Sequence, residues 1–207
     1  MDKPSLILIG AGGHARACID VIEHLGAFKI AGLTGIKEEL HDELLGYPML
    51  GTDTDLPELA KQYQYALITV GQIESPLARK RLYQHVLALG FKLPAIISPI
   101  AHVSGHANVG DGTIVMHGAI VNANANVGNN CIINNKVLIE HDVTVGDHCH
   151  ISTGAIINGA ANIGLGSFVG SGSVIKEGVT LGSQCLVGMG ISVRHHHPEN
   201  SRILKSS

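Results

Sequence analysis

The sequence contains no tryptophan, and aromatic residues make up only 3% of its 207 positions. Glycine, in contrast, occurs 26 times. We therefore expect many tight turns and a narrow core lined by small and β-branched side chains. Apolar residues account for 45% of the chain, which is long enough for one large domain or two small ones with a true hydrophobic core.

Other absences narrow the class of function. The sequence has no run of 18 uncharged apolar residues, and its opening segment MDKPSLILIG reaches glycine too early for a signal peptide. A cytoplasmic protein without membrane insertion is therefore expected. The net charge is −3 and no dense Lys/Arg run occurs, so nucleic acid is not an expected partner. Small-molecule chemistry is favoured.

An uninterrupted six-residue repeat occupies residues 103–193. Positions six apart on an α-helix point in three directions about 240° apart, whereas β-strands accept this spacing on one face. Residues two positions earlier are mostly small and form a second inward-facing row. The first row is aliphatic throughout and comprises Val103, Val109, Val115, Val121, Val127, Ile133, Ile139, Val145, Ile151, Ile157, Ile163, Val169, Ile175, Leu181, Val187 and Val193.

A longer period of 18 residues is superimposed on the hexads, which indicates that three hexads make one coil. The pattern predicts a left-handed parallel β-helix with a triangular cross-section, roughly 24 Å tall at about 4.8 Å per coil. At one corner we expect a backbone with positive φ. The glycines at this corner are Gly110, Gly128, Gly146, Gly164 and Gly182.

Cysteines follow the same register. Cys149 lies 18 residues after Cys131, and Cys185 lies 36 residues after Cys149. A metal or redox cluster is one interpretation, but a stack of small buried residues in successive coils is favoured. Cys18, on a predicted helix, is also expected to be structural.

The first hundred residues have a different pattern, in which strands and helices alternate. This order predicts a small Rossmann-like parallel α/β sheet in residues 1–96, followed by the β-helix domain and a short C-terminal tail in residues 97–207. The predicted strands are 6–9, 29–33, 66–70 and 93–97, and the predicted helices are 15–25, 56–62 and 76–89.

The glycine-rich turn from Gly10 to His14 follows a predicted strand and opens a helix. Backbone N–H groups in such a turn can receive a phosphate or diphosphate, although a simple strand-to-helix turn has the same pattern. The second strand ends in Leu33, Thr34 and Gly35 rather than in the acidic residue of a dinucleotide site. NAD is therefore not predicted.

Together, this turn, the hexapeptide repeat and the segment Ile139-Glu140-His141-Asp142 resemble the bacterial sugar O- and N-acetyltransferases related to sialic acid O-acetyltransferase. The resemblance covers nearly the whole chain. It is strongest to members that acetylate the 4-amino group of UDP-4-amino-4,6-dideoxy sugars or of GDP-perosamine for glycan assembly. It implies acetyl-CoA as co-substrate and a homotrimer in which acetyl-CoA lies between neighbouring prisms and the nucleotide sugar rests on the α/β domain. No metal is expected, because His102, His106, His117 and His148 do not stack in the 18-residue register.

The resemblance also implies residue roles. His141 would be the general base and Asp142 its acidic partner, although Glu140 on the other side is a rival. Gly159, one coil further, would donate its N–H to the acetyl carbonyl. Related sequences carry an acidic pair where this chain has Thr34 and Gly35, so the nucleotide base stays open. The implied acetyl-CoA contacts are His150, Gly159, Ser171 and Met189, and the implied sugar-nucleotide contacts are Gly12, Gly13, His14, Thr34 and Gly35.

Histidine suits the base role because its side chain titrates near pH 6.5. His141 also lies two residues after an inward-facing position, where the neighbouring coils have Ala123 and Gly159 and leave space around the ring. Other functions stay open at this point. O-acetylation of sialic acid or another sugar hydroxyl would use the same base, and a metal-dependent hydratase or a non-catalytic scaffold could share the β-helix.

Overall fold

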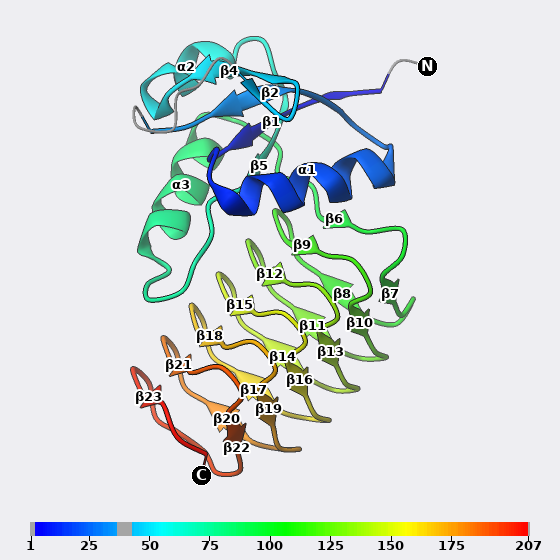
Figure 1. Ribbon diagram of the computed structural model, residues 1–207, viewed down its shortest axis with the longest axis vertical. Helices are drawn as coiled ribbons and strands as arrows, with labels where there is room; N and C mark the ends of the chain where they lie inside the picture. Colours follow the sequence, from blue (N-terminus) through cyan, green and yellow to red (C-terminus); the bar gives the residue numbers. More distant parts are fainter. Residues whose placement is uncertain (1–2, 37–42, 207) are drawn as a thin grey trace.

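The computed structural model describes residues 3–36 and 43–206, and shows an α/β domain seated on one end and one side of a long prism (Figure 1). The domain contains a five-stranded sheet in the order β3-β4-β2-β1-β5. All pairings within it are parallel except β3 with β4. Its strands are β1 (Ser5–Ile9), β2 (Lys29–Thr34), β3 (Glu43–Leu44), β4 (Tyr47–Gly51) and β5 (Tyr65–Ile68), and its helices are α1 (Gly13–Leu25), the 3-10 helix η2 (Asp53–Asp55), α2 (Leu56–Leu59) and α3 (Leu77–Ala88).

Strand β1 forms inside the sheet because its side chains are apolar and become buried there. Leu6, Ile7, Leu8 and Ile9 are all fully buried, as expected for a parallel strand that is covered on both faces. The predicted α/β class is confirmed, but the β3–β4 hairpin was missed. Strand β4 is only partly buried and contains an exposed proline, so it lacks the apolar run that marks the central strands.

The prism consists of two-residue strands that are hydrogen-bonded into three parallel sheets. From β6 to β22 each strand pairs with the strand 18 residues away, so the predicted left-handed β-helix is confirmed. The first sheet contains β6 (Ile96–Ile97), β9 (Ile114–Val115), β12 (Ile132–Ile133), β15 (His150–Ile151), β18 (Phe168–Val169), β21 (Leu186–Val187) and β23 (Arg202–Ile203). The second contains β7 (His102–Val103), β10 (Ile120–Val121), β13 (Leu138–Ile139), β16 (Ile156–Ile157), β19 (Val174–Ile175) and β22 (Ser192–Val193), and the third contains β8 (Asn108–Val109), β11 (Asn126–Val127), β14 (Thr144–Val145), β17 (Asn162–Ile163) and β20 (Thr180–Leu181).

The three outer faces differ in what they present. The first sheet is the docked face, because its outward Ile96, Ile114 and Ile132 pack in one cluster with apolar residues of α1. The third sheet is the polar face, whose exposed outward side chains are asparagine and threonine. The second sheet is the apolar face, because Ile120, Leu138, Ile156 and Val174 point outward from it.

Two predictions about the ends of the prism were wrong. Segment 93–97 was assigned to the α/β domain, and Leu93 does pack in the core of that domain, but β6 at the end of the segment pairs with β9 of the prism because Ile97 lies six residues before Val103 and shares its register. The tail after Val193 was placed outside the prism, but β23 pairs with β21 and buries Ile203 in the core. The prism therefore extends one strand beyond the repeat at each end.

The prediction of positive φ at the glycine corner was also wrong. Gly110 and its equivalents have no positive φ; instead, a Cβ at Gly146 would lie 2.7 Å from the backbone nitrogen of Leu165 in the next coil. Glycine is required there because adjacent coils approach too closely for a side chain. Positive φ occurs two residues later and recurs every six residues, at Gly112, Gly118, Asn124, Asn130, Lys136, Asp142, His148, Gly154, Ala160, Gly166, Gly172, Gly178, Gln184 and Gly190. We call this series the left-handed row.

The cysteines have the expected structural place. Cys131, Cys149 and Cys185 are buried in the prism core as free thiols, and Cys18 is buried on α1. In the described ranges, 3–36 and 43–206, no helix is long and apolar enough to cross a bilayer. No group of three or more histidine, cysteine or acidic residues in these ranges is arranged to hold a metal ion.

A buried arginine joins the α/β domain to the prism. Arg79 on α3 is fully buried and donates hydrogen bonds to the carbonyl oxygens of Ile68 and Val70 in its own domain. It also donates to the backbone oxygen and the Oδ1 of Asn130 in the prism, at 3.1 and 2.8 Å. Burial lowers the pKa of Arg79 to about 10, so the guanidinium stays charged at neutral pH. The two parts are thereby held in a defined relative position.

Candidate active site

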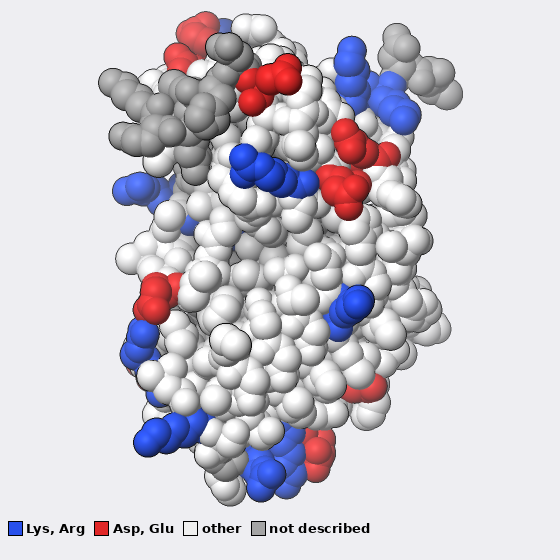
Figure 2. Space-filling model, in the orientation of Figure 1, with Lys and Arg blue, Asp and Glu red and all other residues white. Residues whose placement is uncertain are grey.

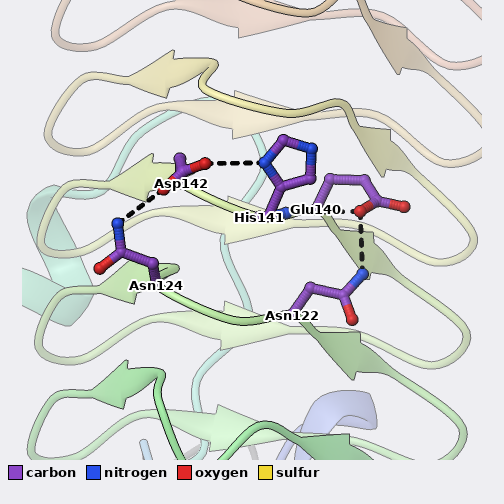
Figure 3. Close-up of polar contacts among 5 residues, drawn as sticks. All are labelled: Asn122, Asn124, Glu140, His141 and Asp142. Carbon is purple, nitrogen blue, oxygen red and sulfur yellow. Dashed lines mark hydrogen bonds and ion pairs between the residues drawn. The ribbon is translucent and has the colours of Figure 1, made fainter.

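The imidazole of His141 and the carboxylate of Asp142 form a hydrogen-bonded pair in the turn after β13 (Figure 3). The Nδ1 atom of His141 lies 2.7 Å from Oδ2 of Asp142, and both side chains are at least half exposed, at 64% and 50%. Because a carboxylate can only accept, the pairing places the ring proton on Nδ1. No described residue bonds Nε2 of His141, so this nitrogen is open to a substrate.

Glu140, the rival partner, faces a different group. Its Oε2 accepts a hydrogen bond from Nδ2 of Asn122 at 2.9 Å, while its contact with the His141 backbone nitrogen is long, at 3.4 Å. In this structure, therefore, Asp142 rather than Glu140 orients the imidazole ring.

The electrostatics of the pair favour a basic histidine. The hydrogen bond to Asp142 raises the pKa of His141 above its ordinary value, and the charges of Asp142 and Glu140 act in the same direction. The pKa of Asp142 is lowered, first by the hydrogen bond from Asn124 and then by that of His141. A proton taken up by Nε2 would thus be stabilised by a carboxylate that stays ionised.

Gly159 lies directly beside the imidazole ring, one coil further along the prism. A Cβ at this position would be 2.8 Å from Cε1 and 2.9 Å from Nε2 of His141. Its backbone N–H bonds no acceptor among the described residues. The open ring nitrogen and a free N–H donor therefore occupy neighbouring coils.

The predicted sugar-nucleotide residues gather at the carboxyl edge of β1 and β2. Gly12 caps α1, and a Cβ at Gly13 would meet nothing within 4 Å. His14 is partly buried, and this burial, together with the charges of Arg79 and His150, lowers its pKa to about 3. The Nε2 of His14 and the Oγ1 of Thr34 are buried without a hydrogen-bond partner in the part of the chain that is described. The N–H of the adjacent Gly35 is bonded to the carbonyl of Gly51.

His150, a predicted acetyl-CoA contact, lies on the docked face beside the α/β domain. Its Nδ1 donates to the carbonyl oxygen of Gln72 at 2.6 Å, and its Nε2 faces Nδ2 of Asn134 at 3.2 Å. Burial lowers the pKa of His150 to about 4, so the ring is neutral at physiological pH. Its centroid is 6.5 Å from that of His14. The structure thus groups His150 with the sugar-nucleotide residues.

Ser171 and Met189 occupy a third location. Both lie in turns that lead from the docked face to the apolar face, whereas His141 and Gly159 lie in turns that lead from the apolar face to the polar face. Met189 is 81% exposed, and Ser171 bonds Ser152 through its hydroxyl at 2.9 Å. Within one chain, the predicted site residues are therefore distributed over different corners of the prism.

Three contacts at or near these groups were not anticipated from the sequence. Asn124 donates to Asp142, Gln72 holds His150, and Arg79 anchors Asn130. The first has a sequence signal, because Asn124 precedes Asp142 by one coil of 18 residues. Gln72 and Arg79 carry no motif, and their role depends on how the α/β domain docks on the prism.

Comparison with known proteins gives consistent matches. Residues 5–86 match the family model of the PglD N-terminal domain. A mutant of perosamine N-acetyltransferase from Caulobacter crescentus, solved with CoA and GDP-perosamine, is 29% identical with a TM-score of 0.88, and the match covers 94% of this chain and 90% of that one. The acetyltransferase domain of PglB from Neisseria gonorrhoeae, in complex with acetyl coenzyme A, is also 29% identical with a TM-score of 0.88, over 96% and 95% of the two chains.

A more distant structure, WeeI from Acinetobacter baumannii, shares the fold at 18% identity and a TM-score of 0.72, over 92% of this chain and 96% of that one. Among curated proteins, no sequence matches this chain.

Proposed function

We propose that this chain, which the fold and the comparisons place beside the bacterial sugar acetyltransferases, transfers the acetyl group of acetyl-CoA to the amino group of a nucleotide-linked 4-amino-dideoxy sugar in glycan biosynthesis. The observation that carries the proposal is the exposed His141–Asp142 pair with the free N–H of Gly159 beside it. Perosamine N-acetyltransferase, matched over 94% of this chain, is described with CoA and GDP-perosamine bound.

The geometry supports a direct transfer. As the amine nitrogen attacks the thioester carbonyl, its proton passes to Nε2 of His141, and Asp142 stabilises the resulting imidazolium. The developing oxyanion accepts the N–H of Gly159. The carbon–sulfur bond then breaks, and CoA leaves as the thiol with the proton returned from His141. Gly12, Gly13, His14, Thr34 and Gly35 would hold the nucleotide sugar with His150 beside them, and Gly159, Ser171 and Met189 would contact acetyl-CoA.

We further propose that residues 1–96 bind the nucleotide sugar and residues 97–207 perform acetyl transfer. Acetyl-CoA and nucleotide sugars are both cytoplasmic metabolites, which supports a cytoplasmic location for the protein.

An assay with paired acceptors tests the reaction. The purified protein is incubated with acetyl-CoA and UDP-, GDP- or dTDP-linked 4-amino sugars, and thiol release and product mass are followed. We expect acetylation of at least one amino sugar and none of the same nucleotide sugar with a hydroxyl in place of the amine. Transfer to sialic acid or another hydroxyl, with no transfer to any amine, would contradict N-acetylation.

A homotrimer is proposed because the site residues are divided between corners of one prism. A second copy can bring the Ser171 and Met189 corner to the His141 and Gly159 corner only across an interface. The apolar face lies between these two corners and supplies the surface: Ile120 is 39% exposed, and the aliphatic residues Leu138, Ile156 and Val174 follow it in successive coils. In Figure 2 most of the visible prism surface carries no charged side chain.

Charge placed on the apolar face should break this assembly. In the double variant Leu138→Asp and Ile156→Asp, burying two carboxylates against another subunit is unfavourable, so we expect a monomer with little activity. Light scattering measures the mass, and the control is Thr144→Asp on the polar face, which should stay trimeric. A wild-type monomer, or a double variant that remains trimeric and active, would contradict the shared site.

A further inference from the structure

Two asparagine–carboxylate bonds connect adjacent coils next to the site (Figure 3). Asn122 donates to Glu140 at 2.9 Å, and Asn124 donates to Asp142 at 2.6 Å. Only the second bond continues to the imidazole, because Asp142 also accepts Nδ1 of His141. The Asn124–Asp142 bond is therefore connected to the imidazole, whereas the similar Asn122–Glu140 bond beside it does not reach the ring.

Both oxygens of Asp142 are used, and by different partners. Oδ1 accepts the amide of Asn124, and Oδ2 accepts the ring of His141. A half-exposed aspartate rotates easily about its terminal torsion, since that torsion has a broad energy profile. Two donors on opposite oxygens fix the carboxylate plane, and the plane in turn fixes the ring.

The backbone places the amide where this contact needs it. Asn124 and Asp142 belong to the left-handed row, with φ of 61° at each, so their side chains leave equivalent points of adjacent coils about 4.8 Å apart. The backbone N–H of Asn124 is bonded to the carbonyl of His106 at 3.1 Å, which anchors the turn independently of the side chain. Asparagine is one of the few residues that adopt this conformation readily.

We propose that Asn124 is a positioning residue for acetyl transfer: its amide holds the Asp142 carboxylate in the orientation that accepts Nδ1–H of His141, and so keeps Nε2 available and directed as the base. This inference rests on the proposed function of His141. Asn124 itself reaches neither the acetyl group nor the acceptor, and it acts through Asp142.

The charged groups that face the ring are few. Asp142 and Glu140 come from its own turn, the preceding coil contributes the neutral amides of Asn122 and Asn124, and the following coil contributes Gly159. The Asn124 hydrogen bond is the largest cause of the lowered pKa of Asp142. Without it, the Asp142 carboxylate is free to rotate, its hydrogen bond to Nδ1 of His141 is made less often, and the pKa of His141 falls toward its ordinary value.

The test is the variant Asn124→Gly, because glycine occupies the left-handed row in other coils and keeps the backbone. We expect kcat to fall about tenfold, as for other residues that orient a functional group, with the KM for acetyl-CoA within about twofold of wild type. NMR titration of His141 without substrates should give a lower pKa. The acid limb of the kcat/KM profile should move to lower pH in parallel.

Two controls separate positioning from structure. Asn122→Ala removes the neighbouring bond to Glu140, and Lys136→Gly places glycine at another position of the left-handed row; both should keep kcat and the His141 pKa near wild type. The proposal is overturned if Asn124→Gly retains the wild-type kcat and His141 pKa, or if Asn122→Ala lowers both equally. If the wild type acetylates no acceptor, the proposed function fails, while the NMR titration still decides whether Asn124 positions the pair.

Discussion

Replacing His141 by alanine is expected to lower kcat by about 10²–10⁴-fold, the usual contribution of a general base. The side chain is exposed and packs into no core, so the thermal unfolding midpoint and the mass of the assembly should not change. Steady-state rates with acetyl-CoA and the accepted amino sugar measure the effect. His85→Ala, an exposed position on α3, is the control and should keep full activity.

The pH profile of the wild-type enzyme tests the role of His141 as the base independently. The base must be unprotonated, and Asp142 raises the pKa of His141, so kcat/KM should begin to fall at a pH above the ordinary histidine value of about 6.5. The residual rate of His141→Ala should not show this decrease at acid pH. A variant that retains near-full activity would remove His141 from the mechanism.

The second large effect is expected from Gly159→Ala. The added methyl group would lie 2.8 Å from Cε1 of His141, closer than two carbon atoms can approach, so the ring must rotate away. A displacement of about 1 Å in a reacting group can cost on the order of 10²-fold in rate, and we expect a loss of this size in kcat. The ring is exposed and can move, so stability should change little.

A matched substitution is available for this test. A Cβ at Gly105, in another turn of the prism, meets nothing within 4 Å, so Gly105→Ala should keep both activity and the thermal midpoint. The backbone N–H is unchanged in Gly159→Ala, and any loss therefore reports on the place of the His141 ring. Wild-type activity in this variant would show that the ring does not work from the position seen in the structure.

Much of the fold follows from the sequence because every residue of a β-helix stacks on the residue 18 positions away. That register alone places His141 beside Gly159 and buries Cys131 over Cys149. It does not distinguish a glycine required by positive φ from one required by lack of space, and this is why the role of Gly146 was misassigned. The same register links Asn124 to Asp142.

Contacts between the two domains have no such regularity. The bond from His150 to Gln72 joins residues 78 positions apart, and the bond from Arg79 to Asn130 spans 51. These contacts depend on how the folded sheet docks on the folded prism, so no local sequence pattern predicts them. The sequence therefore predicts the His141 side of the site better than the His150 side.

The left-handed row also bears on how such a protein can change. Its described members include glycine, asparagine, lysine, aspartate, histidine, alanine and glutamine, all on the same backbone path. A functional group can therefore be exchanged at any level of the prism by a single substitution, without altering the architecture around it. The left-handed row therefore offers equivalent positions in every coil, and a new specificity can arise when a reactive or binding side chain is placed in a different coil.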